Sequence, residues 1–420
     1  MPPESRAEVQ GAVSRGRAAA TSAFFAQGFV FAVVLTHLGA FKERWGIDDL
    51  AITVIMFVVA LLAAVGSVVA GWLAPRFGSA GALRFGLVTL ALGVLGAALA
   101  PSFVVFCVAL GVYGLALGCV DATTNMQAVA CEAMQGRSIL TSFHGSWSAG
   151  GILGALETSG TGSAGWSLAV ALAPVAVVPL IAAATPLLPA RLGLPTGPTE
   201  LPVAGGAARV VAIPWRPMLV LGAAIVLFYV ADSATQSWST IYLHDVLLAS
   251  AGVAPLGYAA YQATSLVARL AGDHLVRRVG PVRVVRLAAT VGAVGLLAAL
   301  LAHTPWVAIV GFAVLGVGIA VVAPLSFAAA GQLASVDADG NPIADPVARR
   351  ATADAIVARV NQFNYLGFVL GGVLTGLVAS GSTMRAGFIV PLVGVALILP
   401  IARGFAVRRA HPIAGQEVSA

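Results

Sequence analysis

The chain has 420 residues, of which 59% are hydrophobic and only 10% are charged, whereas an ordinary soluble domain carries about 25% charged residues. This composition excludes a soluble globular protein and indicates a chain embedded in a membrane. The formal net charge of +6 arises from 22 Arg and one Lys against 17 acidic residues. Because these Arg lie mostly in short segments between apolar runs, they indicate membrane topology rather than binding to nucleic acid.

Apolar runs of roughly 20 residues recur along the chain, each long enough to cross a hydrocarbon core about 30 Å thick. The first run, which begins at Ala18, is too long for the apolar core of a signal peptide, so we expect it to be retained as a helix. The pattern predicts an all-α membrane protein with twelve transmembrane helices. We expect these helices at residues 18–40, 49–71, 82–100, 102–127, 139–158, 165–187, 216–243, 252–271, 284–302, 305–330, 358–379 and 386–403.

A segment rich in Pro and Gly separates the sixth span from the seventh and reads as a linker. We therefore expect a bundle of six helices at residues 1–188, a linker at 189–214 and a second bundle of six helices at 215–420. One face of such a molecule would hold 20 Lys and Arg, whereas the other would hold only Lys42, Arg44 and Arg385. The positive-inside rule then places both termini and the linker in the cytoplasm and the protein in the cytoplasmic membrane.

The two halves repeat each other, which is the pattern of a transporter built from two homologous bundles. The offset between equivalent positions is 202 residues up to the tenth span and 217 residues after the longer loop near residue 340. The matched positions are Arg76 with Arg278, Gly78 with Gly280, Arg84 with Arg286, Gly114 with Gly316, Thr124 with Ser326, His144 with Asn361, Gly150 with Gly367 and Gly154 with Gly371.

Asp121 and Asp232 are the only acidic residues that fall well inside a predicted span, since the others lie in tails, loops, the linker or near span ends. A carboxylate held away from water can bind and release a proton near neutral pH, as a proton-coupled carrier requires. Asp232 shares a helical face with Thr235 and Gln236. It is therefore a candidate for proton coupling or substrate binding, and a buried structural acid is the alternative.

Asp121 lies one helical turn before Asn125, and His144 is expected early in the fifth helix at a similar depth. We expect Asp121 and His144 to lie toward the cytoplasmic mouth, with Asp232 deeper. Two interpretations stay open for the pair. Asp121 and His144 could form a protonation-sensitive gate, or they could form a structural hydrogen bond between the fourth and fifth helices, worth about 1 kcal/mol.

The remaining polar groups of the inner helices are mostly uncharged amides, and aromatic rings accompany them. No Arg or Lys is expected in the middle of a span, because Arg269 and Arg359 are placed at cytoplasmic ends. Phosphates and dicarboxylates are therefore disfavoured as cargo, and a small neutral or amphiphilic solute is favoured. The candidate contacts are Gln27, Asn125, Trp147, Gln236, Trp238, Tyr261, Asn361, Asn364 and Tyr365.

The loop from Gly71 through Arg76 to Gly78, echoed at Arg278 and Gly280, resembles the signature loop of the major facilitator superfamily. The loop departs from the family pattern at Pro75, where the family usually has an acid, while Asp273 in the second half stands at the position of Gly71. These residues are candidates for gating loops, although fixing topology would also explain the arginines. The resemblance extends over essentially the whole chain and implies that the first, fourth, seventh and tenth helices line a central cavity.

Several motifs also resemble a bacterial branch of this superfamily that is related to the fucose and sugar:proton symporters. They are Asp121 with Asn125, Ser142 to Gly145 with Trp147 and Ser148, and Trp238 and Ser239 with Tyr242 and Asp245. The chain departs from this branch at Asp232, where Glu is expected, and at Ser237, where Asp is expected.

We therefore expect a secondary transporter, coupled to protons, that works as a monomer on a small-molecule substrate in the bilayer. A proton-antiporting exporter of drugs or secondary metabolites is the alternative within transport. A membrane enzyme or sensor is the alternative outside it, but the chain lacks a hydrolase or metalloprotease motif and a large soluble domain. No cofactor or metal site is expected.

Overall fold

The computed structural model describes residues 3–135, 139–187, 215–333 and 346–406. Helices account for nearly all of these residues, as the sequence predicts. Their bounds are α1 (Pro3–Thr36), α2 (Leu38–Trp45), α3 (Asp49–Leu99), α4 (Phe103–Gln135), α5 (Leu140–Ser163), α6 (Leu168–Leu172), η1 (Pro174–Ala176), α7 (Val177–Ala184), α8 (Trp215–Ile241), η3 (Tyr242–Val246), α9 (Leu256–Val279), α10 (Pro281–Leu301), α11 (Pro305–Ile319), α12 (Val322–Gln332), α13 (Pro346–Ser380), α14 (Met384–Gly387), α15 (Ile389–Ile401) and η5 (Ala402–Phe405).

Eight helices of the described residues are long and apolar enough to cross a membrane. One of them, α3, is two spans in a row, because Gly78 interrupts the helix with a φ of 74° and a ψ of 155°. The helices α5 and α9 and the pair α6 and α7 supply the remaining crossings. The described residues thus form the twelve spans that the apolar runs predict.

Proline and glycine explain where the spans break. Pro324 has no backbone N–H to donate to Ala320, so the tenth span divides there into α11 and α12. Gly280 separates α9 from α10 with a φ of 83° and a ψ of 156°, nearly the conformation of Gly78. A positive φ costs glycine little, so the repeated loop needs glycine at both positions.

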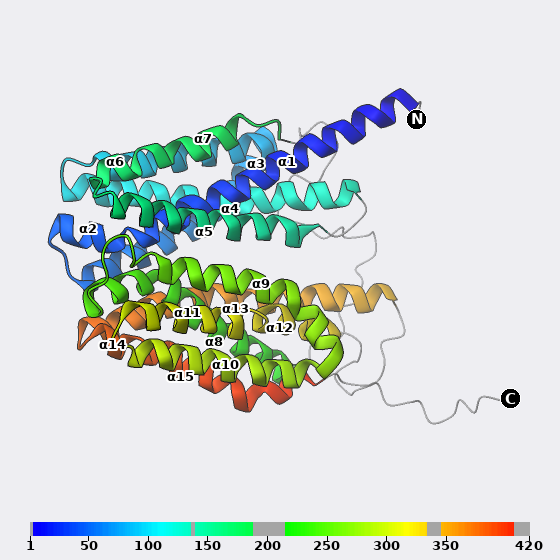
Figure 1. Cartoon of the computed structure of the whole chain (residues 1–420). Coiled ribbons are helices and arrows are strands. Elements are labelled where there is room, and N and C mark those ends of the chain that lie inside the picture. Colours follow the sequence, from blue (N-terminus) through cyan, green and yellow to red (C-terminus); the bar gives the residue numbers. More distant parts are fainter. Residues whose placement is uncertain (1–2, 136–138, 188–214, 334–345, 407–420) are drawn as a thin grey trace.

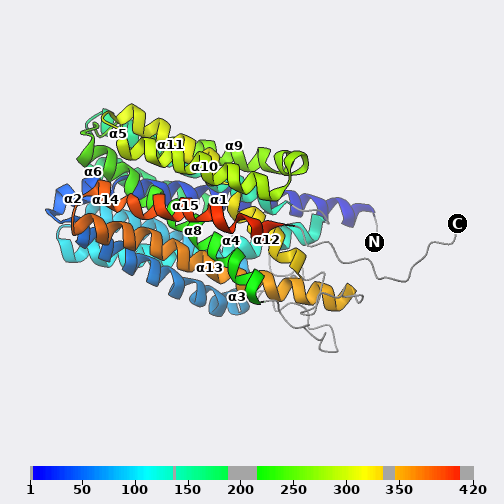
Figure 2. The ribbon, with the colours of Figure 1, turned by 90° about the horizontal axis from the view of Figure 1, so that it is seen from below.

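The helices form two groups, which Figure 1 shows one above the other. We call α1 to α7 the N-half and α8 to η5 the C-half. The predicted linker at 189–214 lies outside the described residues, so the domain boundaries stay a prediction. The halves meet along two lines, where α5 packs against α9 and α3 packs against α13. These contacts lie on opposite sides of the molecule, as the view from below makes clear (Figure 2).

The two ends of the bundle differ in charge. We call the end that carries α2, η3 and α14 the α2 end. The opposite end, where α1 begins, is the arginine-rich end, because Arg76, Arg84, Arg278 and Arg286 lie there. This separation of charge is the one that the sequence predicts.

Backbone contacts confirm the repeat at the level of atoms. A methyl group on Gly114 would lie 2.7 Å from the carbonyl oxygen of Val59, and one on Gly316 would lie 2.4 Å from that of Tyr261. Val59 and Tyr261 are themselves 202 residues apart. Since only glycine lets backbones approach so closely, the same helix crossing is built in both halves.

Arginine caps extend this likeness to the α2 end. Arg44 donates to the carbonyl oxygens of Ala98 and Ala100 at 3.1 and 2.7 Å. Arg385 donates to those of Leu300 and Ala302, the latter at 2.7 Å. Each guanidinium thus satisfies carbonyl groups at the end of the third span of a half. A positive charge at this C-terminal end also interacts favourably with the helix dipole.

Candidate functional site

Asp232 lies in α8 and is deeply buried, with 5% of its surface exposed. One turn later, Gln236 donates from Nε2 to Oδ2 of Asp232 at 2.6 Å. The hydroxyl of Tyr261 in α9 donates to Oδ1, and the hydroxyl of Tyr258 donates to Oε1 of Gln236 at 3.5 Å. These four residues form the Asp232 cluster, which ties α8 to α9 and gives both carboxylate oxygens a donor.

Asp121 lies in α4 and is half-buried. The amide of Gln27 in α1 donates from Nε2 to Oδ1 of Asp121 at 2.9 Å. The hydroxyl of Thr124 lies 3.3 Å from Oε1 of the same Gln27. Asn125 donates to the backbone carbonyl of Asp121 at 2.8 Å and does not bind its carboxylate. We call Asp121, Gln27, Thr124 and Asn125 the Asp121 cluster.

The two acids lie at similar depth. Asp232 corresponds through the repeat to Val30 of α1, three residues beyond Gln27, which binds Asp121. At a rise of 1.5 Å per residue, this offset is only about 4.5 Å toward the α2 end. The two acids therefore lie within about one helical turn of each other in depth, and a deeper position of Asp232 stays a prediction.

Both acid clusters lie in the region where the two halves face each other. The phenol of Tyr229, one turn before Asp232 in α8, feels the charge of Asp232 and also that of Asp121 in the other half. The charge of Asp121 also acts on Tyr365 of α13, which is 59% exposed. We call the region where α1, α4 and α5 face α8, α9 and α13 the central space.

Arg269 lies within α9. We expected it at a cytoplasmic helix end, but α9 continues for ten more residues, to Val279. Its charge acts on Asp232, Tyr261 and Tyr229 in the C-half and on His144 in the N-half. A cation of α9 therefore lies near Asp232, and the argument from sequence against anionic cargo did not take it into account.

His144 is exposed near the start of α5 and lies edge-on to Phe24, with 5.3 Å between ring centroids. Its charge and that of Asp121 interact, but these two described side chains form no hydrogen bond. Asp121 binds Gln27 instead, so the fourth helix is joined to the first rather than to the fifth. The predicted structural hydrogen bond is therefore wrong, and the gating role stays a prediction.

Aromatic rings bridge the halves beside the acids. Trp147 of α5 packs against Phe31 of α1 with 5.8 Å between ring centroids, and Phe31 in turn lies 6.4 Å from Phe368 of α13. Trp238 is located elsewhere, since its indole Nε1 donates to the carbonyl of Gly372 at 2.8 Å and its ring is buried between α8 and α13. Trp147 is thus placed near the central space, whereas Trp238 packs two helices of the C-half.

The other predicted residues divide in the same way. Asn364 is half-buried in α13, one residue before Tyr365, whereas the side chain of Asn361 lies outside the description. Arg76 donates to the carbonyl of Trp72 at 2.8 Å and lies over its ring at 3.8 Å. Arg278 is exposed at the end of α9. Gly71 and Asp273 lie inside helices α3 and α9, and the side chain of Asp273 is not described.

At the α2 end, ion pairs connect the halves. The ammonium of Lys42 in α2 lies 2.6 Å from Oδ2 of Asp245 in η3 and 2.7 Å from Oδ1 of Asp49. His244 lies 3.5 Å from Glu43 across the same junction. Desolvation lowers the pKa of Lys42, but hydrogen bonds and charges from Asp245 and Asp49 outweigh it and hold the pKa above its usual value.

Sequence reasoning missed Tyr258 and the Lys42–Asp245 contact. Tyr258 is fully buried and completes the Asp232 cluster. Its spacing of three and four residues from Tyr261 and Gln262 is a signal that could have identified it, because residues so spaced share a helix face. The positive charge of Lys42 was used only to assign membrane topology, and nothing in the sequence indicated its partner.

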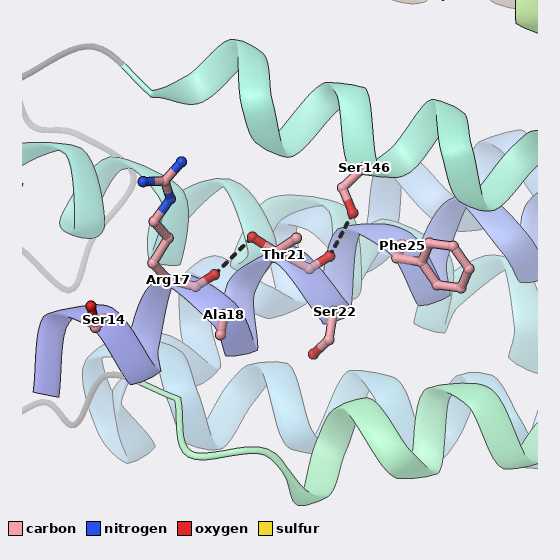
Figure 3. A pocket seen from close by; sticks show the side chains of 7 residues that line it. All are labelled: Ser14, Arg17, Ala18, Thr21, Ser22, Phe25 and Ser146. Atoms are coloured by element: carbon pink, nitrogen blue, oxygen red, sulfur yellow. Dashed lines mark hydrogen bonds between the residues drawn. The ribbon is translucent and has the colours of Figure 1, made fainter. Parts of the chain in front are cut away.

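A separate open pocket of about 500 Å³ lies along the middle of α1. Figure 3 shows its lining, with Ser146 of α5 donating to the backbone of Thr21 at 2.9 Å. Its other lining residues are Ser14, Arg17, Ala18, Ser22 and Phe25. None of these residues belongs to either acid cluster.

Among the residues that the structure describes, no group of three His, Cys, Asp or Glu side chains could hold a metal ion. The three cysteines are free thiols.

Comparison with known proteins points to transport. A family model described as Major Facilitator Superfamily matches residues 19–344. A transporter of Sinorhizobium fredii is 28% identical over 387 residues, which are 90% of this chain and 95% of that protein. An MFS-type transporter of Yersinia pestis is 26% identical over 366 residues, covering 87% of this chain and 89% of its own.

Solved structures support the same fold. The nucleoside transporter NupG has a TM-score of 0.65 at 16% identity and covers 92% of this chain and 97% of its own. The E. coli fucose:proton symporter FucP has a TM-score of 0.53 at 16% identity, with 93% and 98% covered. The matched family model, the transporter relatives and the shared fold agree, and we conclude that the chain is a membrane transporter belonging to the major facilitator superfamily.

Proposed function

We propose that this transporter moves a small polar organic solute across the cytoplasmic membrane by alternating access and couples that movement to protons through Asp232. The observation that carries the proposal is the Asp232 cluster. A buried carboxylate that receives hydrogen bonds from Gln236 and Tyr261 borders the space between the halves. A carboxylate inside a span is costly unless function requires it, and proton relays are a common reason.

The charge distribution supports a cytoplasmic location for the arginine-rich end and for both termini. The α2 end would then face away from the cytoplasm. There Lys42 contacts Asp245, and Ser159 of α5 donates to the carbonyl of Gly252 in the other half. Toward the arginine-rich end, His144 and Tyr365 are exposed. These features favour a conformation closed at the α2 end and open to the cytoplasm, from which one half rocks against the other.

The lining of the central space favours recognition by amides and aromatic faces. Gln27, Gln236 and Asn364 can donate and accept hydrogen bonds, and Trp147 and Tyr365 offer ring faces for an apolar part of the solute. The sequence favoured a neutral or amphiphilic solute because it placed no cation there. Arg269 removes that restriction, so the charge of the solute becomes a separate question.

The test has two stages. A thermal-shift screen of the purified full chain against sugars, nucleosides, amino acids, organic acids and drugs identifies a ligand that stabilises the native state. Radiolabelled ligand is then followed in proteoliposomes, with and without an imposed pH gradient. We expect accumulation that requires the gradient, and we expect Asp232→Asn to abolish it while exchange of ligand without a gradient continues.

Accumulation that is unchanged in Asp232→Asn, at matched protein content, would refute coupling through Asp232. Reversing the pH gradient separates the two transport directions. Accumulation into vesicles that are acidic inside would indicate exchange of solute for protons, the exporter alternative, whereas accumulation driven by acid outside indicates symport. We propose that the monomer is the working unit, because each chain contains both halves of the central space.

A further inference from the structure

We propose that Arg269, facing His144 across the central space, binds a carboxylate group of the transported solute. This inference rests on the proposed function and narrows its substrate class to small organic monocarboxylates. It assigns a role to a cation that makes no hydrogen bond to the described residues of either acid cluster.

The register of α5 against α9 places the two basic side chains opposite each other. A methyl group on Gly151 of α5 would lie 3.3 Å from the Tyr258 hydroxyl and 3.5 Å from Nε2 of Gln262 in α9. Toward the α2 end, the hydroxyl of Ser159 in α5 donates to the carbonyl of Gly252, in the turn that leads into α9. As residue numbers rise along α5 they fall along α9, so the helices are antiparallel.

Continuing this register by two turns leads to the candidate site. His144 lies seven residues before Gly151, and Arg269 lies seven residues after Gln262. Seven residues are almost two complete turns, so each side chain keeps the face of its helix that points at the other half. The charges of Arg269 and His144 do act on each other. The helix register therefore carries the placement, and the interaction of the two charges is consistent with it.

The guanidinium of Arg269 has N–H donors that are available to bind a solute. It is half-buried, and among the residues that the structure describes none accepts a hydrogen bond from it and no carboxylate lies within the 4.0 Å of an ion pair. The carboxylate of Asp232, with which it interacts electrostatically, already accepts hydrogen bonds from Tyr261 and Gln236. A guanidinium offers five N–H donors in a planar fork that fits a carboxylate with two parallel hydrogen bonds.

The surrounding charges favour one carboxylate over a doubly charged group. Asp121 and Asp232 border the same space, and their negative charges would repel a second charge on the solute. A monocarboxylate places its single charge on Arg269 and leaves its remaining atoms to the amides and aromatic rings. Carried with one proton, such a solute would cross the membrane without net charge.

Binding is tested at equilibrium, without transport. Melting temperatures of the purified full chain in a neutral detergent are measured at constant ionic strength against sodium benzoate, sodium gluconate and sodium phosphate. Benzamide and gluconamide serve as neutral partners of the two carboxylates. The variants are Arg269→Gln, Arg269→Lys, which keeps the charge but loses the fork, and Arg277→Gln, which removes an exposed Arg from the same helix eight residues further on.

We expect at least one carboxylate to raise the melting temperature more than its amide does. Arg269→Gln should lower the affinity for that carboxylate by about tenfold or more, and Arg269→Lys should lower it by less. Arg277→Gln should leave the affinity unchanged. Where Arg269→Gln does not fold, the comparison of Arg269→Lys with the native chain decides.

Three results would overturn the assignment: neither carboxylate exceeding its amide, a carboxylate effect that persists without Arg269, or stabilisation by phosphate alone. Because no pH gradient enters this measurement, its failure is distinguishable from a failure of proton coupling.

Discussion

The N-half and the C-half share a scaffold but differ in the polar groups that it carries. Gly114 and Gly316 make the same close helix contact, and Gly78 and Gly280 adopt the same backbone conformation. In contrast, Asp121 corresponds to Ala323 in the second half, and Asp232 corresponds to Val30 in the first. The repeat therefore preserves packing, and each half places its acid on a different helix.

This difference indicates that the shared packing serves the movement of the halves and that the unshared acids serve proton coupling. Two similar scaffolds let one half rock against the other, because equivalent smooth helix faces meet at the interface. A carboxylate repeated in both halves would double the number of buried charges and the cost of desolvating them. The two acids instead face one space from unlike surroundings, so they are suited to unlike roles.

Replacing each acid with Asn should give the largest contrast. Asp232→Asn is expected to reduce gradient-driven accumulation by roughly a hundredfold or more, the size of a lost proton-transfer group. Asp121→Asn keeps an acceptor for Gln27, so its effect should stay within about tenfold, the equivalent of one interhelical hydrogen bond. Accumulation and gradient-free exchange are measured in the same proteoliposomes.

Equal loss of accumulation in both acid variants would remove the distinction between the halves. A larger loss in Asp121→Asn would assign coupling to the N-half instead. Gradient-free exchange serves as the internal control, since a variant that has merely misfolded loses this activity as well.

The shared glycines provide the next largest effect. Gly114→Ala and Gly316→Ala each place a methyl group within 2.7 Å of a backbone oxygen, and overpacking of this kind costs about 1–3 kcal/mol. Both variants should melt at clearly lower temperatures than the native chain. Gly160→Ala is the matched control, because nothing lies within 4 Å of its added methyl group.

The two glycine variants should also differ in function. Gly316 packs against the backbone of Tyr261, whose hydroxyl holds Asp232. Gly316→Ala should therefore impair coupling more than its stability loss explains, whereas Gly114→Ala should not. Identical coupling defects in the two variants would argue against this difference between the halves.

The spans, the repeat, the charge separation and the two interior acids could be predicted from sequence for a physical reason. Each depends on a local property, such as apolar length, a glycine requirement or the cost of a charge in hydrocarbon. Asp232 and Gln236 are also neighbours in sequence, so their contact follows from helix periodicity.

Contacts between distant helices could not be predicted in this way. Asp121 and His144 have similar depth, but the packing of α4 against α1 decides that Gln27 is the partner of Asp121. Arg269 ends an apolar run, yet α9 continues beyond it as a helix. Hydropathy therefore located a change in composition and not the end of the helix. Trp238 was likewise a plausible ligand contact until the structure placed its indole against Gly372.

Removing the hydrogen-bond donor to each acid should change stability by different but smaller amounts than the glycine substitutions do. Tyr261→Phe leaves Oδ1 of the deeply buried Asp232 without its donor, at a cost of about 1 kcal/mol or somewhat more. Gln27→Leu does the same to the half-buried Asp121, where water can replace the lost bond, so its loss should be smaller. Melting temperatures report both, and Tyr365→Phe, at a phenol that is 59% exposed, is the control. A larger loss in Gln27→Leu would reverse the inferred ranking of the two sites.

The smallest effect is expected where the halves touch, at the pair of Lys42 and Asp245. Both side chains are partly exposed, at 23% and 31%, so a double-mutant cycle with Lys42→Met and Asp245→Asn should give a coupling energy of only about 0.2–1 kcal/mol.

The hydrogen bonds and charges of Asp245 and Asp49 overcome desolvation and raise the pKa of Lys42. A raised lysine pKa contributes stability that is fully present below the ordinary pKa and is lost as pH rises through the folded value. The contribution of Lys42 should therefore be constant between about pH 7 and 9, and a contribution that already falls within this range would show that Lys42 does not hold its proton at the junction of the halves.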